Sequence, residues 1–149
     1  MNTFETSLNS LLVDTFNYIL RYEEIALKAI LNSPVTVTEA HALEAVGKQS
    51  GGVTVSEIAA ALNIAFPTAT VAVKKLEHKG FVTKSSCSED ARRFIVTLTD
   101  KGKWINKAHE LFHRKMVNNI SREFSDSEQD ILLRAVQKLS AFFKEKVEA

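Results

Sequence analysis

Three histidines and a pair of glutamates are the residues whose types and spacing best fit metal chemistry. His109 and His113 stand four positions apart in a helical stretch, so both can face one point. His41 lies early in a second expected helix, and Glu23 and Glu24 lie in a third. Imidazole nitrogens and a carboxylate can build a tetrahedral zinc site, and our candidate ligands are His41, His109, His113 and Glu24. The alternative is a group of polar side chains lining a subunit or domain junction.

A second group of residues suits contact with a nucleic acid. The helix expected from Phe66 to Lys79 would turn hydroxyls and amines outward, toward phosphates and base edges, and Val71 could touch a thymine methyl group. The helix before it would present Ser56 and its first backbone amides to a phosphate. The expected DNA contacts are Ser56, Pro67, Thr68, Thr70, Val71, Lys74, Lys75, Lys84, Asp90, Arg92 and Arg93.

The arginines in this set lie at the tip of a predicted hairpin. Arg92 and Arg93 would follow the DNA backbone or enter a narrow minor groove, and Asp90 could pair with Arg92 and hold the tip in shape. Arg92→Ala should therefore weaken binding to every sequence, whereas changes at Thr68 or Val71 should alter sequence preference. The alternative is that all of these are solvated surface charges.

The elements that must position these side chains occupy residues 54–102. Thr54 and Glu57 form a capping box that starts a short helix, which ends at a turn over Asn63 and Ile64. Pro67 suits the first turn of the next helix, and Gly80 suits a left-handed cap at its end. Residues 81–84 and 94–98 are rich in β-branched side chains and predict a paired hairpin. This order predicts a winged helix-turn-helix, a mainly α fold with a small β-hairpin wing.

Long amphipathic helices flank this unit on both sides. Helices are predicted over 4–31, from a capping box at Thr36 to about Lys48, from Thr99 to about Asn119, and after a third capping box at Ser125. We expect a single domain over 1–149, with a DNA-binding lobe at 36–99 and dimerisation helices at 4–31 and 100–147. The apolar stripes of the terminal helices exceed what the central unit can cover, which favours a homodimer over a monomeric helical core.

Composition sets the class of protein. The 149 residues are 45% hydrophobic and 25% charged, as in ordinary globular domains. Residues 54–115 hold 11 basic and 6 acidic side chains, a net charge of +5 inside a chain whose total is +1. The single cysteine, Cys87, excludes an intrachain disulfide and fits a reducing cytoplasm, where we expect a surface thiol. We find no membrane-length apolar run, signal peptide or catalytic motif, and we expect no enzyme and no required cofactor.

The order of elements and two motifs resemble the MarR family of bacterial regulators. The motifs are Leu76-Glu77-His78-Lys79-Gly80-Phe81-Val82 and Asp90-Ala91-Arg92-Arg93 followed by Leu98-Thr99-Asp100-Lys101-Gly102. The resemblance implies a homodimer on a pseudo-palindromic operator, usually a repressor, in which a ligand changes the spacing of the recognition helices. Many members carry a basic residue where Val71 stands, so base preference there is open.

Further short matches resemble two branches of the family. Residues 38–41, 46–48 and 109–117 are similar to the repressor of fatty-acid synthesis genes, which implies an acyl chain on acyl carrier protein as co-repressor. The histidine positions also resemble those of the zinc-responsive branch. A rival class is a winged-helix protein-interaction module with no DNA target, since a fold alone does not fix function.

Overall fold

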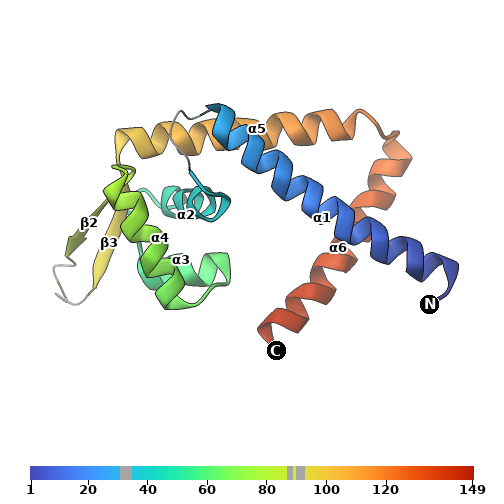
Figure 1. The fold of residues 1–149 in the computed structure, drawn as a ribbon, viewed down its shortest axis with the longest axis horizontal. Coiled ribbons are helices and arrows are strands. Elements are labelled where there is room, and N and C mark those ends of the chain that lie inside the picture. Colours follow the sequence, from blue (N-terminus) through green and yellow to red (C-terminus); the bar gives the residue numbers. More distant parts are fainter. Residues whose placement is uncertain (31–34, 87–88, 90–92) are drawn as a thin grey trace. The chain divides into compact units, whose positions relative to one another are not determined.

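The computed structural model describes residues 1–30, 35–86, 89 and 93–149 (Figure 1). The chain divides into two compact units, Met1–Glu110 and Leu111–Ala149. The elements are α1 (Thr3–Ile30), α2 (Val37–Gly47), β1 (Val53–Thr54), α3 (Val55–Leu62), α4 (Phe66–His78), β2 (Val82–Ser86), β3 (Phe94–Leu98), α5 (Asp100–Ser121) and α6 (Asp126–Glu148). Cys87, Asp90 and Arg92 lie outside the described residues.

Reciprocal side-chain caps start four of the helices. The predicted capping boxes of α2, α3 and α6 are confirmed: Thr36, Thr54 and Ser125 each accept from the backbone three residues on, whose glutamate reaches back. Asn2 and Glu5 form the same arrangement at the start of α1, with bonds of 2.8 and 2.9 Å, which the sequence analysis did not predict.

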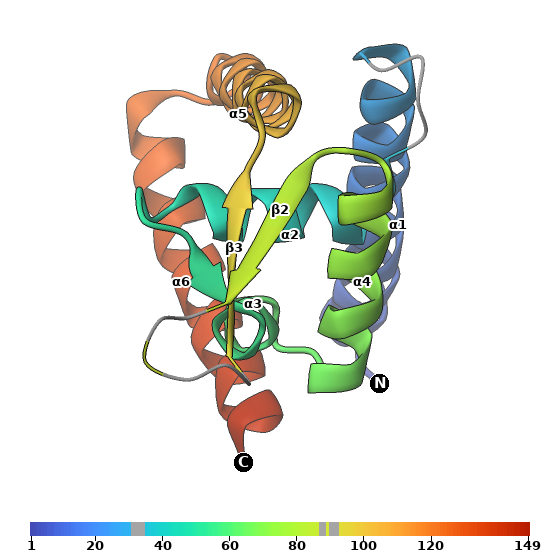
Figure 2. The same ribbon diagram turned by 90° about the vertical axis from the view of Figure 1, so that its left-hand side faces the viewer.

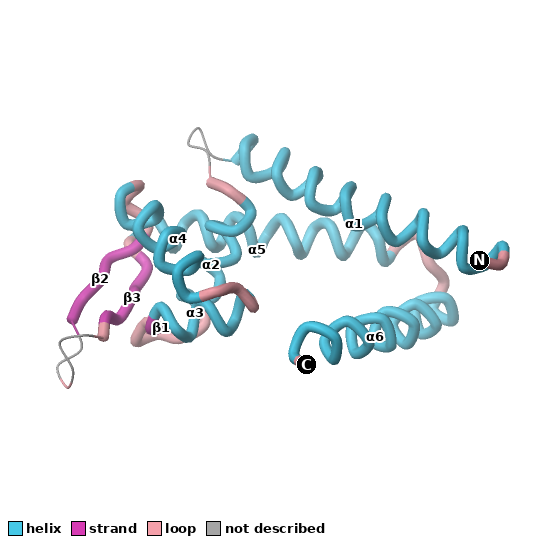
Figure 3. Tube along the Cα trace, turned by 60° about the horizontal axis from the view of Figure 1, so that its bottom comes forward, coloured by secondary structure: helices cyan, strands magenta, loops and turns pink. Residues whose placement is uncertain are grey.

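The sheet has three antiparallel strands in the order β1-β3-β2 (Figure 2). The predicted hairpin is confirmed as β2 and β3, in which Val82 pairs with Leu98 and Lys84 with Val96. β1 was not predicted, because two residues give no alternation to detect; it joins the sheet through Val53, opposite Val96. The described chain outside this small sheet is mostly helical (Figure 3).

The first unit folds around its own core. Leu43 of α2, Ile58 of α3, Leu76 of α4 and Phe81 before β2 are all fully buried. Apolar area removed from water at this junction is the main stabilising contribution, about 1.5–3 kcal/mol for each such side chain. The three short helices and the hairpin thereby form the predicted winged helix-turn-helix, in which α3 and α4 are bent by 112° at their break.

The second unit has a different character. α6 has no buried residue within one chain, although its sequence is clearly amphipathic. Its exposed apolar side chains include Ile131, Leu133, Val136, Phe142 and Phe143.

Among the described helices, none by itself has the length and apolar content to cross a membrane; only the bent α3–α4 pair meets that test, on length and composition.

Candidate nucleic-acid interface

α4 is a two-faced helix, buried on one side and polar on the other. Ala69, Ala72, Val73 and Leu76 are buried in the first unit's core at helical spacing. Pro67 is in the first turn as predicted, where its missing N–H breaks no helical bond. The helix ends beyond His78, and Gly80 has a φ of 80°, the left-handed conformation expected of the cap.

The opposite face of α4 carries five of the eleven predicted contacts. Thr68, Val71, Lys74 and Lys75 are exposed, and Val71 keeps 52% of its surface accessible. Thr70 differs, because it is half-buried and its hydroxyl donates to the carbonyl of Phe66 at 3.0 Å. Its oxygen can still accept a hydrogen bond, but its donor is already used within the helix.

α3 precedes α4 as the supporting helix of the motif. Ser56 lies exposed in its first turn, next to Glu57, whose backbone N–H donates to the Thr54 hydroxyl. Asn63 ends α3 with φ 53° and ψ 46°, and its N–H donates back to the carbonyls of the last turn. This left-handed residue makes the predicted turn, because asparagine tolerates a conformation that most side chains avoid.

The wing contributes basic side chains from β2 and the start of β3. Lys84 is half-buried, and its ammonium group lies 5.1 Å from the centre of the Phe94 ring in a cation–π contact. Arg93 is exposed just before β3. The predicted roles of Asp90 and Arg92 fall on residues that the structure does not describe. Lys84 and Arg93 therefore give the wing its described positive charge.

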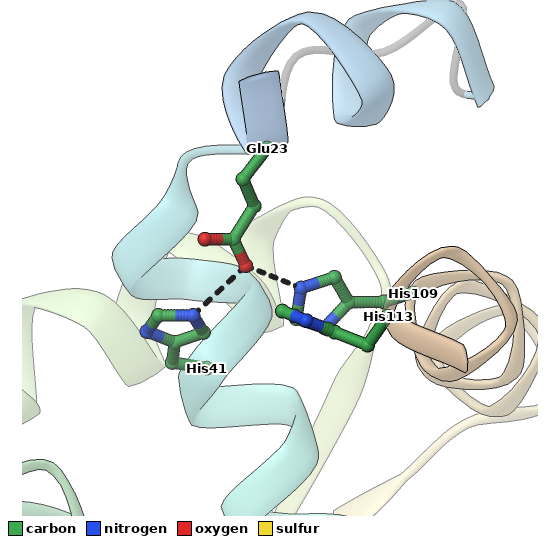
Figure 4. A group of neighbouring side chains, drawn as sticks. All are labelled: Glu23, His41, His109 and His113. Carbon is green, nitrogen blue, oxygen red and sulfur yellow. Dashed lines mark hydrogen bonds and ion pairs between the residues drawn. The ribbon is translucent and has the colours of Figure 1, made fainter. Parts of the chain in front are cut away.

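The histidine cluster brings together residues from α1, α2 and α5 (Figure 4). Oε1 of Glu23 lies 2.9 Å from Nε2 of His41 and 2.6 Å from Nε2 of His109. Glu23 and His109 are buried, and the His41 ring is partly exposed. The ligand atoms of these three residues all lie within 4.8 Å of one another. His113 follows one helical turn after His109 on α5, as its spacing predicts.

The prediction of Glu24 as the carboxylate of this cluster was wrong, because its neighbour Glu23 lies there instead. Glu24 is partly exposed and pairs with Arg21 at 3.0 Å and Lys28 at 3.7 Å, all on one face of α1. Glu23 takes its place, since it lies four residues before Leu27 and these two are the buried residues of α1. That spacing is a signal that the sequence contained, because a residue one turn from a buried leucine faces the same way.

Electrostatics hold the Glu23 carboxylate in its charged form. Burial by itself raises its pKa, but hydrogen bonds to His109 and His41 and their charge outweigh burial, so the pKa is lowered from 4.5. A charged carboxylate beside imidazole nitrogens is a donor set that zinc accepts. Ligand atoms of tetrahedral zinc lie about 3.3 Å apart. The Glu23 oxygen is nearer than that to both histidine nitrogens, so zinc binding would replace these two hydrogen bonds and move the atoms slightly apart.

A cavity of about 410 Å³ lies elsewhere in the first unit, between the end of α2, the end of β3 and α5. Its lining is mainly polar, and Val46 and Leu98 are its aliphatic side chains. Its walls are Val46, Gly47, Gln49, Ser50, Gly52, Thr97, Leu98, Lys103, Asn106, Lys107 and Glu110. The volume suits a small molecule, but the polar walls match an acyl chain poorly.

A buried core beneath an exposed polar helix face, with a hairpin beside it, defines a winged helix-turn-helix fold. A family model for the MarR family matches residues 35–94. The transcriptional regulator AdcR of Streptococcus pneumoniae is 30% identical over 108 residues, which cover 70% of this chain and 73% of AdcR. The chain belongs to the MarR family.

Two further comparisons agree with this assignment. The HTH-type transcriptional regulator BilQ of Clostridium symbiosum is 35% identical over 95 residues, 63% of this chain and 65% of BilQ, so the match spans slightly less than two thirds of that relative. The crystal structure of Streptococcus pneumoniae FabT in complex with DNA superposes with a TM-score of 0.89 and 28% identity, covering 95% of this chain and 98% of FabT. The chain is therefore a DNA-binding transcriptional regulator of this family.

Proposed function

We propose that two copies of this chain form a repressor that binds a pseudo-palindromic operator. The observation that carries the proposal is the exposed polar face of α4, a helix whose other face is fixed by four buried residues. A helix held in this way can enter a major groove without losing its place in the fold. The superposition on FabT in complex with DNA supports the same role.

The exposed apolar side chains of α1 and α6 supply the reason for two copies. Phe16 and Tyr18 of α1 and Phe142 of α6 are more than half exposed, an unfavourable state for large apolar groups in water. A second copy would cover such surfaces and place two α4 helices about 34 Å apart, one turn of DNA. Each wing would grip the flanking backbone, and Lys74, Lys75, Arg92 and Arg93 would displace counterions.

Selection from random duplexes followed by gel shifts tests this function. We expect wild type to enrich a pseudo-palindrome, and Thr68→Ala and Val71→Ala to change which bases are preferred. Lys144→Met, on the exposed surface of α6, is the matched control and should leave preference unchanged. Failure to enrich any sequence, together with no retention on nonspecific DNA at low salt, would favour the rival protein-interaction module.

As effector we propose an acyl chain, delivered on acyl carrier protein as co-repressor for fatty-acid synthesis genes. Support comes from the resemblance of residues 38–41, 46–48 and 109–117 to that branch. The polar cavity has few apolar side chains to pack against an acyl group, so the acyl group would need an apolar site elsewhere on the protein. Footprints with and without acylated carrier protein test this, and unchanged protection would refute it.

Zinc is the second candidate effector, favoured by the geometry of Glu23, His41 and His109. Oxygen and nitrogen donors from three helices converge there, and His113 adds a donor one turn along α5. We expect metal analysis to find one zinc ion per chain, lost in His109→Ala and kept in His78→Ala. His78 is the matched control because it is an exposed histidine outside the cluster. Zinc retained by His109→Ala, or absent from wild type, would refute a metal site.

A further inference from the structure

A partly buried ion pair joins α2 to the end of α4. Nζ of Lys79, the residue that caps α4, lies 2.7 Å from Oε2 of Glu39 in the first turn of α2. The Glu39 side chain is 3% exposed and that of Lys79 27%, so the contact is largely removed from water. Because 40 residues separate the partners, the pair is a tertiary contact rather than a local helix pairing.

The Glu39 carboxylate is held in place before it meets the lysine. The same oxygen accepts the backbone N–H of Thr36 at 3.3 Å, and the Thr36 hydroxyl accepts the backbone N–H of Glu39 at 3.1 Å. This capping box fixes the position of the carboxylate on α2. Lys79 therefore meets an anchored acceptor, and the end of α4 is tied to a defined point.

The residues after Lys79 are tied to the start of α5 in the same unit. The hydroxyl of Thr99 donates to the carbonyl of Gly80 at 2.7 Å, and its backbone N–H donates to Phe81 at 3.0 Å. The other end of α4 is held more loosely, since Ala65 offers no side-chain cap and Phe66 is 54% exposed. The C-terminal end of α4 is thus the end that the fold fixes.

We infer that the Glu39–Lys79 pair sets the orientation of α4 for DNA, and that Lys79 is a positioning residue rather than a phosphate contact. The inference rests on the proposed function, in which α4 enters the major groove. A phosphate contact would draw Lys79 away and leave a buried, uncompensated carboxylate, which is costly. Lys74 and Lys75, exposed on the same helix, serve phosphates without that cost.

The test measures gel-shift affinity and its salt dependence for Glu39→Gln, Lys79→Met and the double variant. The probes are a duplex selected by wild type and an unrelated duplex. Glutamine still accepts the Thr36 N–H, so the helix cap survives while the ion pair is lost. We expect each single variant to bind the selected duplex about tenfold more weakly. The double variant should be no worse than either, the salt slope should be unchanged, and Lys79→Arg should restore binding.

Opposite results identify the competing role. If Lys79 contacted a phosphate, Lys79→Met would lower the salt slope by about 0.9 and weaken both duplexes alike. Glu39→Gln would then leave affinity unchanged or raise it, because it frees a cation. Either pattern overturns the inference. Lys75→Met separates the two proposals: if it weakens DNA binding while the Glu39 and Lys79 variants do not, only the inference fails, and if none of these variants changes affinity, the proposed function of α4 fails as well. Circular dichroism at the assay temperature confirms that each variant is folded.

Discussion

α4 and α6 are both amphipathic helices, yet their apolar faces differ in burial within one chain. Four residues of α4 are buried within one chain, and none of α6 is. The chain's own core buries the apolar face of α4, and the polar face of α4 is left available for a partner that is polar and charged. The apolar face of α6 lacks cover in one chain, so its partner must be apolar. Periodicity reveals two faces on a helix, and only the core shows which of them is left for a partner.

The largest expected effect breaks this contrast at α6. Replacing Phe142 and Phe143 together by glutamate puts two charges into the surface that we expect a second copy to cover. We expect monomers in sedimentation equilibrium and at least a hundredfold loss of operator affinity, because a lone α4 reads one half-site. Lys144→Glu is the control in the last turns of α6, and it should remain dimeric. A double variant that still dimerises would place the interface elsewhere.

The next effect tests how closely the start of α5 packs against the backbone of Phe81 in the first unit. A Cβ on Gly102 would collide with the backbone carbonyl of Phe81, whereas one on Gly51 would meet nothing within 4 Å. Gly102→Ala should lower the free energy of unfolding by about 1–3 kcal/mol, as overpacking does. Gly51→Ala should leave it nearly unchanged. Equal denaturation midpoints for the two variants would show that the start of α5 yields easily.

The sequence predicted features that depend on local chemistry better than features that depend on packing. Capping boxes, Pro67 and Gly80 placed the helix ends correctly, because their chemistry is local and acts within four residues. The histidines were predicted to meet, but the choice between Glu23 and Glu24 required knowing which face of α1 is buried. The Glu39–Lys79 pair could not be predicted, because it depends on the packing of α2 against α4.

A smaller effect should distinguish charge from shape on α4. Lys75→Met removes one exposed cation while keeping the length of the side chain. We expect the slope of log affinity against log salt to fall in magnitude by about 0.9, equally for selected and unrelated duplexes. Val71→Ala should leave the slope unchanged and alter base preference. Gel shifts from low to moderate salt measure both, and a slope unaffected by Lys75→Met would exclude a phosphate contact there.

The smallest effect concerns acid stability at the cluster. The pKa of Glu23 is lowered from 4.5 because its hydrogen bonds to His109 and His41 outweigh burial, so the unfolded chain takes up the proton first as pH falls. Its stabilising contribution is complete above that value and is lost as pH falls through the lower folded-state pKa. Glu23→Gln should therefore flatten the acid limb of a stability profile.

Glu24→Gln supplies the matched control for that profile. The pKa of Glu24 is also lowered, first by its hydrogen bond to Arg21 and then by Lys28, but these partners are exposed. About 1 M salt should erase the difference between Glu24→Gln and wild type and leave most of the Glu23→Gln difference. If both differences disappear in salt, the cluster is open to solvent and is a weaker candidate for zinc.

The most direct test of the account is a footprint of the selected duplex combined with the mass of the complex in solution. We predict two chains on one duplex, protecting two half-sites that are related by dyad symmetry and centred about one helical turn apart. A single chain bound to one asymmetric half-site, or no protection at low salt, would contradict the central claim.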